Sequence, residues 1–128
     1  MSWLYIDTRQ KGQSQIAWLQ AEGKILQRDI KGRAKAVLTA IEKDWDTHAP
    51  KLKGIIVVSG PGSFSSIRTG VLYANLFSRF LGLPMHEIIG AGELRLENIL
   101  KQVQAGQLPR KQYIEPRYDR DPNITMPK

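Results

Sequence analysis

The hydrophobic pattern of the sequence predicts an α/β domain with a mixed sheet, and three observations support this. Short apolar segments rich in β-branched and aromatic residues, separated by turn residues, fill the first 30 positions and are typical of strands. From residue 34 onward, apolar residues recur at the spacing of one helical face. Further along, the uninterrupted β-branched run 55–58 indicates a central strand that is covered on both faces.

Each element follows from its own local pattern. Compact apolar segments predict a meander of three strands at 3–6, 14–19 and 25–30, with Gly23 in the second turn, where it can take a positive φ. The first helix runs from Ala34 to Trp45, because its apolar residues fall at i, i+3, i+4, i+7 and i+11. The later elements are strand 55–58, loop 59–63, helix 65–81, strand 85–89 and helix 91–104.

The resulting order, βββαβαβα, predicts a mixed five-stranded sheet with helices packed on it. This is the layout of the ribonuclease-H-like fold, which is also the half-domain of the actin, Hsp70 and sugar-kinase (ASKHA) superfamily. The chain length of 128 residues fits one domain. We therefore expect a single lobe over residues 1–108 and an extended, proline-containing tail over 109–128.

The composition excludes several chemistries, but the net charge does not indicate a particular binding partner. The chain has no cysteine, so disulfides, thiolate zinc sites and cysteine nucleophiles are excluded. The net charge of +7 is spread evenly along the chain, whereas nucleic-acid binders usually concentrate their basic residues. No apolar stretch approaches the ~20 residues that span a bilayer, and the N-terminus does not resemble a secretory signal. We expect a cytoplasmic protein.

The sequence predicts no catalytic residue and no metal site. A nuclease of this fold needs several carboxylates that converge on two metal ions; Asp7 is placed for one, but the central strand offers none. The two histidines, His48 and His86, are far apart and form no His-x-x-x-His pair. The Gly-x-Ser-x-Gly elbow of a hydrolase is also absent.

The glycine-rich loop that follows the central strand allows two interpretations. It could hold an anion with Asp7 and with the backbone amides of Gly60, Gly62 and Ser63 at a helix N-terminus. Alternatively, the glycines serve an unusual backbone path and Ser63 or Ser65 caps the helix. The first interpretation would make the chain a small nucleotide- or anion-binding module. A separate alternative is an RNA-binding module, whose contacts would come from the basic tail residues Arg110, Lys111, Arg117 and Arg120.

The helix predicted at 65–81 is apolar on two sides. A row of small residues, Gly70, Ala74 and Ser78, would let its backbone approach the sheet closely. The opposite side carries Leu72, Tyr73, Leu76 and Phe80. A helix that is apolar nearly all round is buried on both sides, so we expect the second side to meet a partner chain, or else to be covered by the third helix or the tail.

The segment 57–70, Val-Val-Ser-Gly-Pro-Gly-Ser-Phe-Ser-Ser-Ile-Arg-Thr-Gly, closely resembles the signature of the bacterial TsaB family, also called YeaZ. The start, 4–8, is similar to that family's first strand, and Leu83-Pro84 and the tail segment 113–118 are similar as well. Two positions depart from the usual pattern: Ser65-Ser66 stands for Thr-Gly, and Gly32-Arg33 stands near a usual His-Ser. Members usually carry a second lobe between the signature half and the tail; here residues 106–110 lead directly from the last predicted helix into the tail, so we expect that lobe to be absent between these segments.

The resemblance implies a non-catalytic subunit that supports the synthesis of threonylcarbamoyladenosine at position 37 of tRNAs. It implies pairing with a TsaD homologue, which holds the catalytic site, through helices of this lobe, and a homodimer when the chain is alone. A TsaE-type ATPase joins such assemblies, tRNA is contacted indirectly or weakly, and no cofactor is expected except ATP at an interface with partner subunits. The partner-binding residues would be Leu72, Tyr73, Leu76, Phe80, Val37 and Ile41; the anion or structural loop would comprise Asp7, Gly60, Gly62, Ser63 and Arg68.

Overall fold

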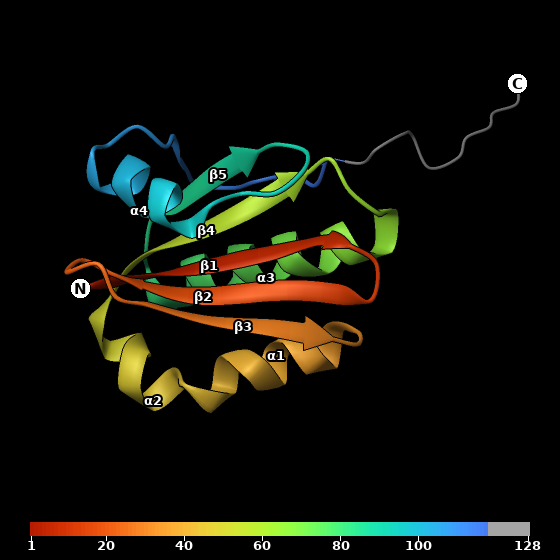
Figure 1. Cartoon of the computed structure of the whole chain (residues 1–128), viewed down its shortest axis with the longest axis horizontal. Coiled ribbons are helices and arrows are strands. Elements are labelled where there is room, and N and C mark those ends of the chain that lie inside the picture. The colour runs from red at the N-terminus through yellow and green to blue at the C-terminus, as the bar shows by residue number, and fades with distance from the viewer. Residues whose placement is uncertain (118–128) are drawn as a thin grey trace, which may run out of the picture.

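A computed structural model describes residues 1–117, so Arg120 and the last residue of the tail segment 113–118 lie outside the described residues. Its centre is a six-stranded sheet in the order β3-β2-β1-β4-β5-β6 (Figure 1). The strands are β1 (Ser2–Gln10), β2 (Gln13–Gln20), β3 (Ile25–Lys31), β4 (Leu52–Gly60), β5 (Met85–Ile89) and β6 (Arg110–Lys111). The helices are α1 (Ala34–Lys43), α2 (Trp45–His48), the 3-10 turn η1 (Ala49–Lys51), α3 (Phe64–Leu81) and α4 (Leu96–Gln104).

The sheet is mixed, as the element order predicts. The first three strands form an antiparallel meander, whereas β4 runs parallel to β1 and β5 runs parallel to β4. Parallel neighbours need a crossover between them, which helices α1 and α2 supply before β4 and helix α3 supplies before β5. The confirmed class is an α/β lobe of the ribonuclease-H-like type.

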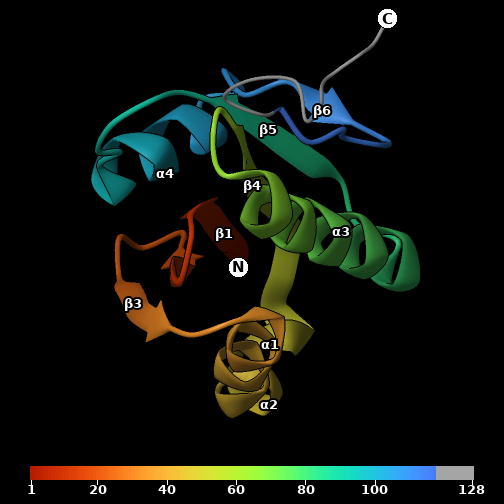
Figure 2. The ribbon, with the colours of Figure 1, turned by 90° about the vertical axis from the view of Figure 1, so that its right-hand side faces the viewer.

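Two apolar cores hold the helices against the two faces of the sheet (Figure 2). Alternate residues of each strand point to opposite faces, so Leu4 and Ile6 pack under α1 and α3, whereas Trp3 and Tyr5 pack under α4. The central run 55–58 contributes to both cores, and each of its side chains is at most 1% exposed. The prediction of a strand covered on both faces is thus confirmed.

Apart from the exact lengths of the strands, three features differ from the prediction. The sheet gains a sixth strand because Arg110–Lys111 of the tail pairs antiparallel with β5, and so short a pairing has no local sequence pattern. The first helix stops at Lys43 because Asp44 leaves helical geometry and both its oxygens accept hydrogen bonds from Arg28 of β3. Residues 91–95 form a loop, with Gly92 at φ +79°, so α4 begins only at Leu96.

The described part of the tail is draped over the core. Ile114 is 2% exposed and belongs to the core beneath α1 and α3. The amide side chain of Asn75 in α3 donates to the Ile114 carbonyl at 2.9 Å and accepts from its N–H at 3.1 Å, as a neighbouring strand would. Within residues 1–117 no helix has both the length and the apolar character needed to cross a membrane.

Candidate functional site

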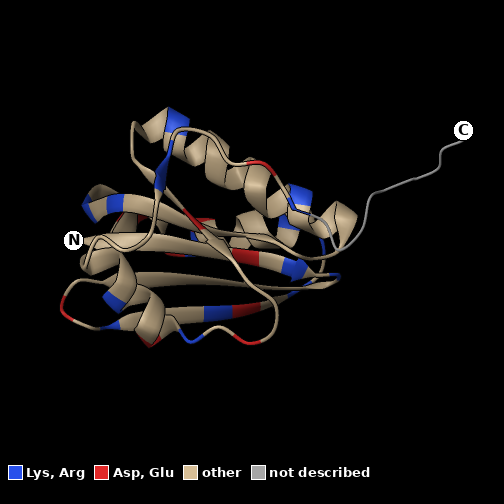
Figure 3. Ribbon diagram, turned by 90° about the horizontal axis from the view of Figure 1, so that it is seen from above, with Lys and Arg blue, Asp and Glu red and all other residues tan. Residues whose placement is uncertain are grey.

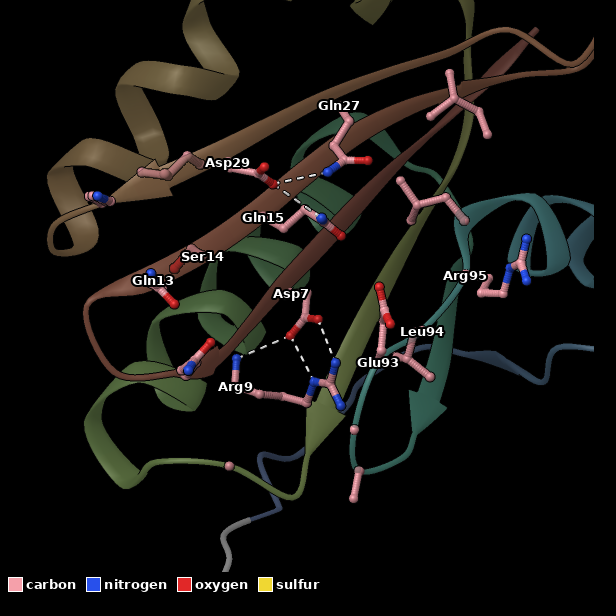
Figure 4. A pocket seen from close by; sticks show the side chains of 18 of the residues that line it. Asp7, Arg9, Gln13, Ser14, Gln15, Gln27, Asp29, Glu93, Leu94 and Arg95 are labelled. Carbon is pink, nitrogen blue, oxygen red and sulfur yellow. Dashed lines mark hydrogen bonds and ion pairs between the residues drawn. The ribbon is translucent and has the colours of Figure 1, made fainter.

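The fold leaves a polar groove on the sheet face that α4 covers only in part (Figure 4). Its floor is formed by β1, β2 and β3 where they extend beyond α4, and its walls are the 91–97 segment and the loop residues Pro61 and Gly62. The volume is about 1430 Å³. Much of the floor is built from amides and charges: Asp7, Arg9, Gln13, Gln15, Gln27 and Asp29.

Asp7 lies in this groove, but its carboxylate is engaged by Arg9. Nε and Nη2 of Arg9 donate to the two Asp7 oxygens at 2.9 and 2.8 Å, and the Arg9 backbone N–H donates to Oδ1 at 3.1 Å. The remaining guanidinium nitrogen, Nη1, donates to the carbonyl of Gly90 at 2.6 Å. This arrangement raises the pKa of Arg9 through its hydrogen bond to Asp7. Arg9 thus ties the aspartate to the wall of the groove.

The pKa values of two further groups, one beneath the groove and one in its floor, are shifted by their surroundings. Burial, followed by the Asp7 charge, raises the pKa of Tyr5 far above its ordinary value, and its hydroxyl donates to Asp7 at 3.3 Å. Hydrogen bonds from Gln27 and then Gln15 lower the pKa of Asp29. The carboxylates of Asp7 and Asp29 are thus each matched by donors of the same sheet face.

The glycine loop next to the groove is closely packed against the chain. A Cβ on Gly62 would come within 2.6 Å of the Arg9 carbonyl oxygen, and a Cβ on Gly60, which has φ +136°, would collide with the Arg117 carbonyl. Ser63 occupies the N-cap position of α3 without a capping hydrogen bond from its side chain, and its N–H donates to the Arg9 carbonyl at 2.9 Å. The packing favours the structural interpretation of these glycines.

The predicted loop residues are only partly brought together. Asp7, Gly62 and Ser63 meet around Arg9, whereas Arg68 lies further along α3 with its guanidinium over the Phe64 ring, 5.6 Å from the ring centre. Sequence reasoning missed Arg9, whose one local signal was its position two residues after Asp7, on the same face of a strand. Among residues 1–117, no group of three or more His, Asp or Glu could hold a metal ion.

A second polar cluster, also missed, ties the tail to the sheet. The side chain of Glu87 in β5 is 5% exposed, and its carboxylate accepts hydrogen bonds from the Ser59 hydroxyl at 2.6 Å and from Nε of Arg117 at 3.0 Å. It also forms an ion pair with Nζ of Lys111 at 3.4 Å. Burial raises the pKa of Glu87, but these donors outweigh it, so the net shift is downward. Two of the basic tail residues considered for RNA contact are therefore engaged with the protein itself.

An apolar ridge on α3 is the other candidate site. Leu72, Leu76 and Phe80, on successive turns, are 55%, 53% and 85% exposed; we call these three residues the α3 ridge. Tyr73 lies beside it, half-buried, and donates its hydroxyl to the Ala34 carbonyl of α1 at 3.0 Å. The small residues Gly70, Ala74 and Ser78 are buried on the opposite side of the helix, as the sequence predicts.

Val37 and Ile41 do not belong to this surface. They are 1% and 0% exposed and lie in the core between α1 and the sheet, so a partner cannot reach them in this fold. Placing them among the partner-binding residues was wrong, because the one apolar stripe of α1 is already used to attach that helix to its own lobe.

Comparison with known proteins agrees with the fold class. No family model and no curated protein matches the sequence. Solved structures that share the fold include YeaZ from Pseudomonas aeruginosa and a structure described as an uncharacterized protein with similarity to peptidase YEAZ from Pseudomonas aeruginosa. Each matches with a TM-score of 0.61 and 20% identity, and the match covers 69% of this chain and 43% of that one. The chain thus has the fold of a YeaZ lobe and spans less than half of those proteins.

Proposed function

We propose that this chain is a non-catalytic subunit that binds a TsaD homologue and supports the threonylcarbamoylation of adenosine 37 in tRNA. The observation that carries the proposal is the α3 ridge, which lies on a lobe with the YeaZ fold. The signature-like segment 57–70 leads directly into the same helix. Fold, motif and exposed surface therefore support one role.

The α3 ridge has the features of a docking surface. Side chains four residues apart lie above one another on a helix, so the three exposed residues form one continuous apolar strip. Contiguous apolar surface of this kind on a small protein marks an interaction site more often than a chance exposure does. Aromatic contacts attach the neighbouring side of α3 to the lobe, because Tyr73 and Phe77 pack against each other and Phe77 packs against Trp45.

The groove supports an accessory role rather than one in chemistry. The Asp7 carboxylate in β1 is the group that this fold could offer to a metal ion or phosphate, and here it accepts three hydrogen bonds from Arg9. Chemistry supplied by a partner chain is compatible with that arrangement.

Co-expression with a bacterial TsaD homologue tests the proposal. We expect the two chains to co-purify and co-elute in gel filtration, and we expect Leu76→Asp to abolish the complex because it places a charge in an apolar contact. Asn98→Asp, on the exposed side of α4, makes the same charge change elsewhere and should bind like the wild type. A chain that never co-purifies with the homologue, or a complex that Leu76→Asp leaves intact, would contradict the proposal.

A further inference from the structure

Strand β3 forms one edge of the sheet, and hydrogen bonds at both ends of the β2–β3 hairpin fix which of its main-chain groups face outward. The N–H of Gln20 donates to the Lys24 carbonyl at 2.8 Å, and the N–H of Gly32 donates to the Gly12 carbonyl at 3.1 Å. Both bonds join even-numbered residues, and the register between them is unbroken. Because bonded and non-bonded pairs alternate in an antiparallel ladder, the odd-numbered residues of β3 point their main-chain groups away from β2. We call these residues the β3 edge: Ile25, Gln27, Asp29 and Lys31.

The β3 edge is open among residues 1–117. Strand β3 pairs with β2 alone, and no other backbone hydrogen bond of the described residues reaches the β3 edge. Helix α1 packs under one face of β3 through Leu26 and Ile30, whereas the side chains of the β3 edge line the polar groove on the other face (Figure 4). Proteins commonly protect such an edge with a proline or a bulge, and β3 has neither.

The charges of β3 do not repel a second strand of the same kind. Asp29 lies between Arg28 and Lys31, and Figure 3 shows basic and acidic segments following one another on strands of the sheet. The Arg28 guanidinium donates to both carboxylate oxygens of Asp44, so its charge is balanced within the lobe. The remaining charges of the strand, on Asp29 and Lys31, balance each other.

We propose that two copies of this chain join through antiparallel pairing of their β3 edges, so that the two sheets become one sheet across a two-fold axis. A two-fold interface brings the same surface of each copy together. With the axis at Arg28, Gln27 faces Asp29 of the second copy and Ile25 faces Lys31 of the second copy. Every residue of both edges then takes part in the ladder, and the Arg28 side chains that meet at the axis are already neutralised within their own lobes.

The side chains favour this register over its two neighbours. Nε2 of Gln27 donates to the Asp29 carboxylate at 3.0 Å within one copy, and the same two groups would face each other across the axis. On the opposite face of the sheet, Leu26 would face Ile30 of the second copy. An axis at Asp29 would bring two carboxylates directly opposite each other, which opposes pairing. An axis at Gln27 would leave Lys31 beyond the end of the second strand.

This inference is independent of the proposed function and uses a different surface. Helix α3 packs against β1 and β4 in the middle of the sheet, whereas β3 is the outermost strand. The α3 ridge therefore stays free in the paired form. Leu76→Asp, which alters the ridge, should leave the pairing of β3 unchanged.

A proline on the β3 edge tests the main-chain contacts. Gln27→Pro removes an outward N–H and leaves the hydrogen bonds to β2 in place, and edge strands tolerate proline there. Gln27→Ala is the matched control, because it loses the same side chain but keeps the N–H. Sedimentation velocity up to millimolar protein compares both variants with the wild type. We expect the wild type and Gln27→Ala to dimerise, and Gln27→Pro to associate about tenfold more weakly than Gln27→Ala.

Spin labels test the register. The chain has no cysteine, so Gln27→Cys, Asp29→Cys and Lys31→Cys each carry a single label at an exposed position. With the axis at Arg28, positions 27 and 29 are each offset from their own copies by two residues along the strands, and position 31 by six. At roughly 3.4 Å per residue, we expect equal offsets of about 7 Å at 27 and 29 and an offset of about 20 Å at 31.

Three results would overturn the inference. The wild type could stay monomeric at millimolar concentration, Gln27→Pro could dimerise as tightly as Gln27→Ala, or the labels at 27 and 29 could show no dipolar coupling in the dimer. The last result would place the contact on another surface, such as the α3 ridge. Thermal unfolding verifies that the proline variant is folded, and if it is not, Asp29→Pro is compared with Asp29→Ala instead.

Failure of the proposed function is measured separately, by co-purification of the wild type with the TsaD homologue. Gln27→Pro should co-purify with that homologue as the wild type does, because the variant leaves the α3 ridge intact. A β3 dimer without a complex would refute the subunit role alone, and a complex without a β3 dimer would refute the edge pairing alone.

Discussion

Gly70 in α3 approaches Thr8 of β1 so closely that a methyl group has no room between them. A Cβ on Gly70 would overlap the Thr8 hydroxyl and lie 2.9 Å from its methyl group. That hydroxyl donates to the Ser66 carbonyl at 2.7 Å and accepts from the Gly70 N–H at 3.2 Å. Gly70→Ala must therefore displace either the threonine or the helix.

The expected cost follows from three contributions. Overpacking costs about 1–3 kcal/mol, and disturbing a buried hydrogen bond costs about 1 kcal/mol. Alanine favours the helix over glycine by about 1 kcal/mol, which offsets part of the loss. We expect Gly70→Ala to lower the free energy of unfolding by about 2 kcal/mol.

Thr8 provides the means to test this cause. Thr8→Ala removes both hydrogen bonds of the Thr8 hydroxyl, to the Ser66 carbonyl and from the Gly70 N–H, at a cost of about 1 kcal/mol each, or about 2 kcal/mol together. It also removes the atoms that collide with the new methyl group. The double variant should then be destabilised by about 2 kcal/mol rather than by the sum of about 4 kcal/mol, a coupling that a double-mutant cycle measures.

Urea denaturation of the four proteins is the assay, with unchanged m-values as the condition for comparing stabilities. Gly90→Ala is the matched control, because Gly90 does not have a positive φ and its Cβ would meet only Leu94 at an ordinary 3.5 Å. The reasoning would be refuted if the Gly70 and Thr8 effects added within about 0.5 kcal/mol. It would also fail if Gly70→Ala were as mild as the control.

Two further predictions concern the tail. The pKa of Glu87 is lowered in the folded state from its ordinary 4.5, so its contribution to stability is present above pH 4.5 and is lost as the pH falls through the lower folded value. Glu87→Gln should therefore lower the stability at neutral pH and make the stability depend less on pH in the acid range. Thermal unfolding at a series of pH values measures this, and an unchanged pH profile would contradict it. Ile114→Ala should cost about 3 kcal/mol by opening a cavity beneath α3, whereas Tyr113→Ala, at a side chain that is 66% exposed, should cost little; equal effects in chemical denaturation would show that the tail is not part of the core.

The sequence predicted best those elements whose buried apolar residues recur at the spacing of a strand or a helix. Strand 85–89 coincides with β5, and helix 65–81 differs from α3 by one residue at its start. For both elements, the signals are local in the sequence: the apolar spacing, and the glycine and proline that mark the end of the helix and precede the strand. The predicted strands were shorter than β1 and β4 because polar residues at their ends continue the hydrogen-bonded ladder without an apolar signal.

The parts that sequence reasoning missed depend on contacts between distant segments. The sixth strand consists of two tail residues that pair with β5. The end of α1 at Lys43 depends on Arg28 of β3, which donates a hydrogen bond to Asp44. The groove was missed for the same reason: Arg9 reaches the Gly90 carbonyl 81 positions away. No window of adjacent residues contains such information.

The candidate docking surface shows how an apolar pattern and a fold combine. The apolar residues of α4 (Leu96, Ile99, Leu100 and Val103) are all buried against the sheet, and Val37 and Ile41 of α1 are buried likewise. Helix α3 has two apolar sides and only one sheet to cover. Its glycine side must face that sheet, because only a residue without a Cβ fits against Thr8, and this leaves the leucine side exposed. The sequence pattern reveals the surplus of apolar surface, and the close contact at Gly70 decides which side of α3 stays exposed.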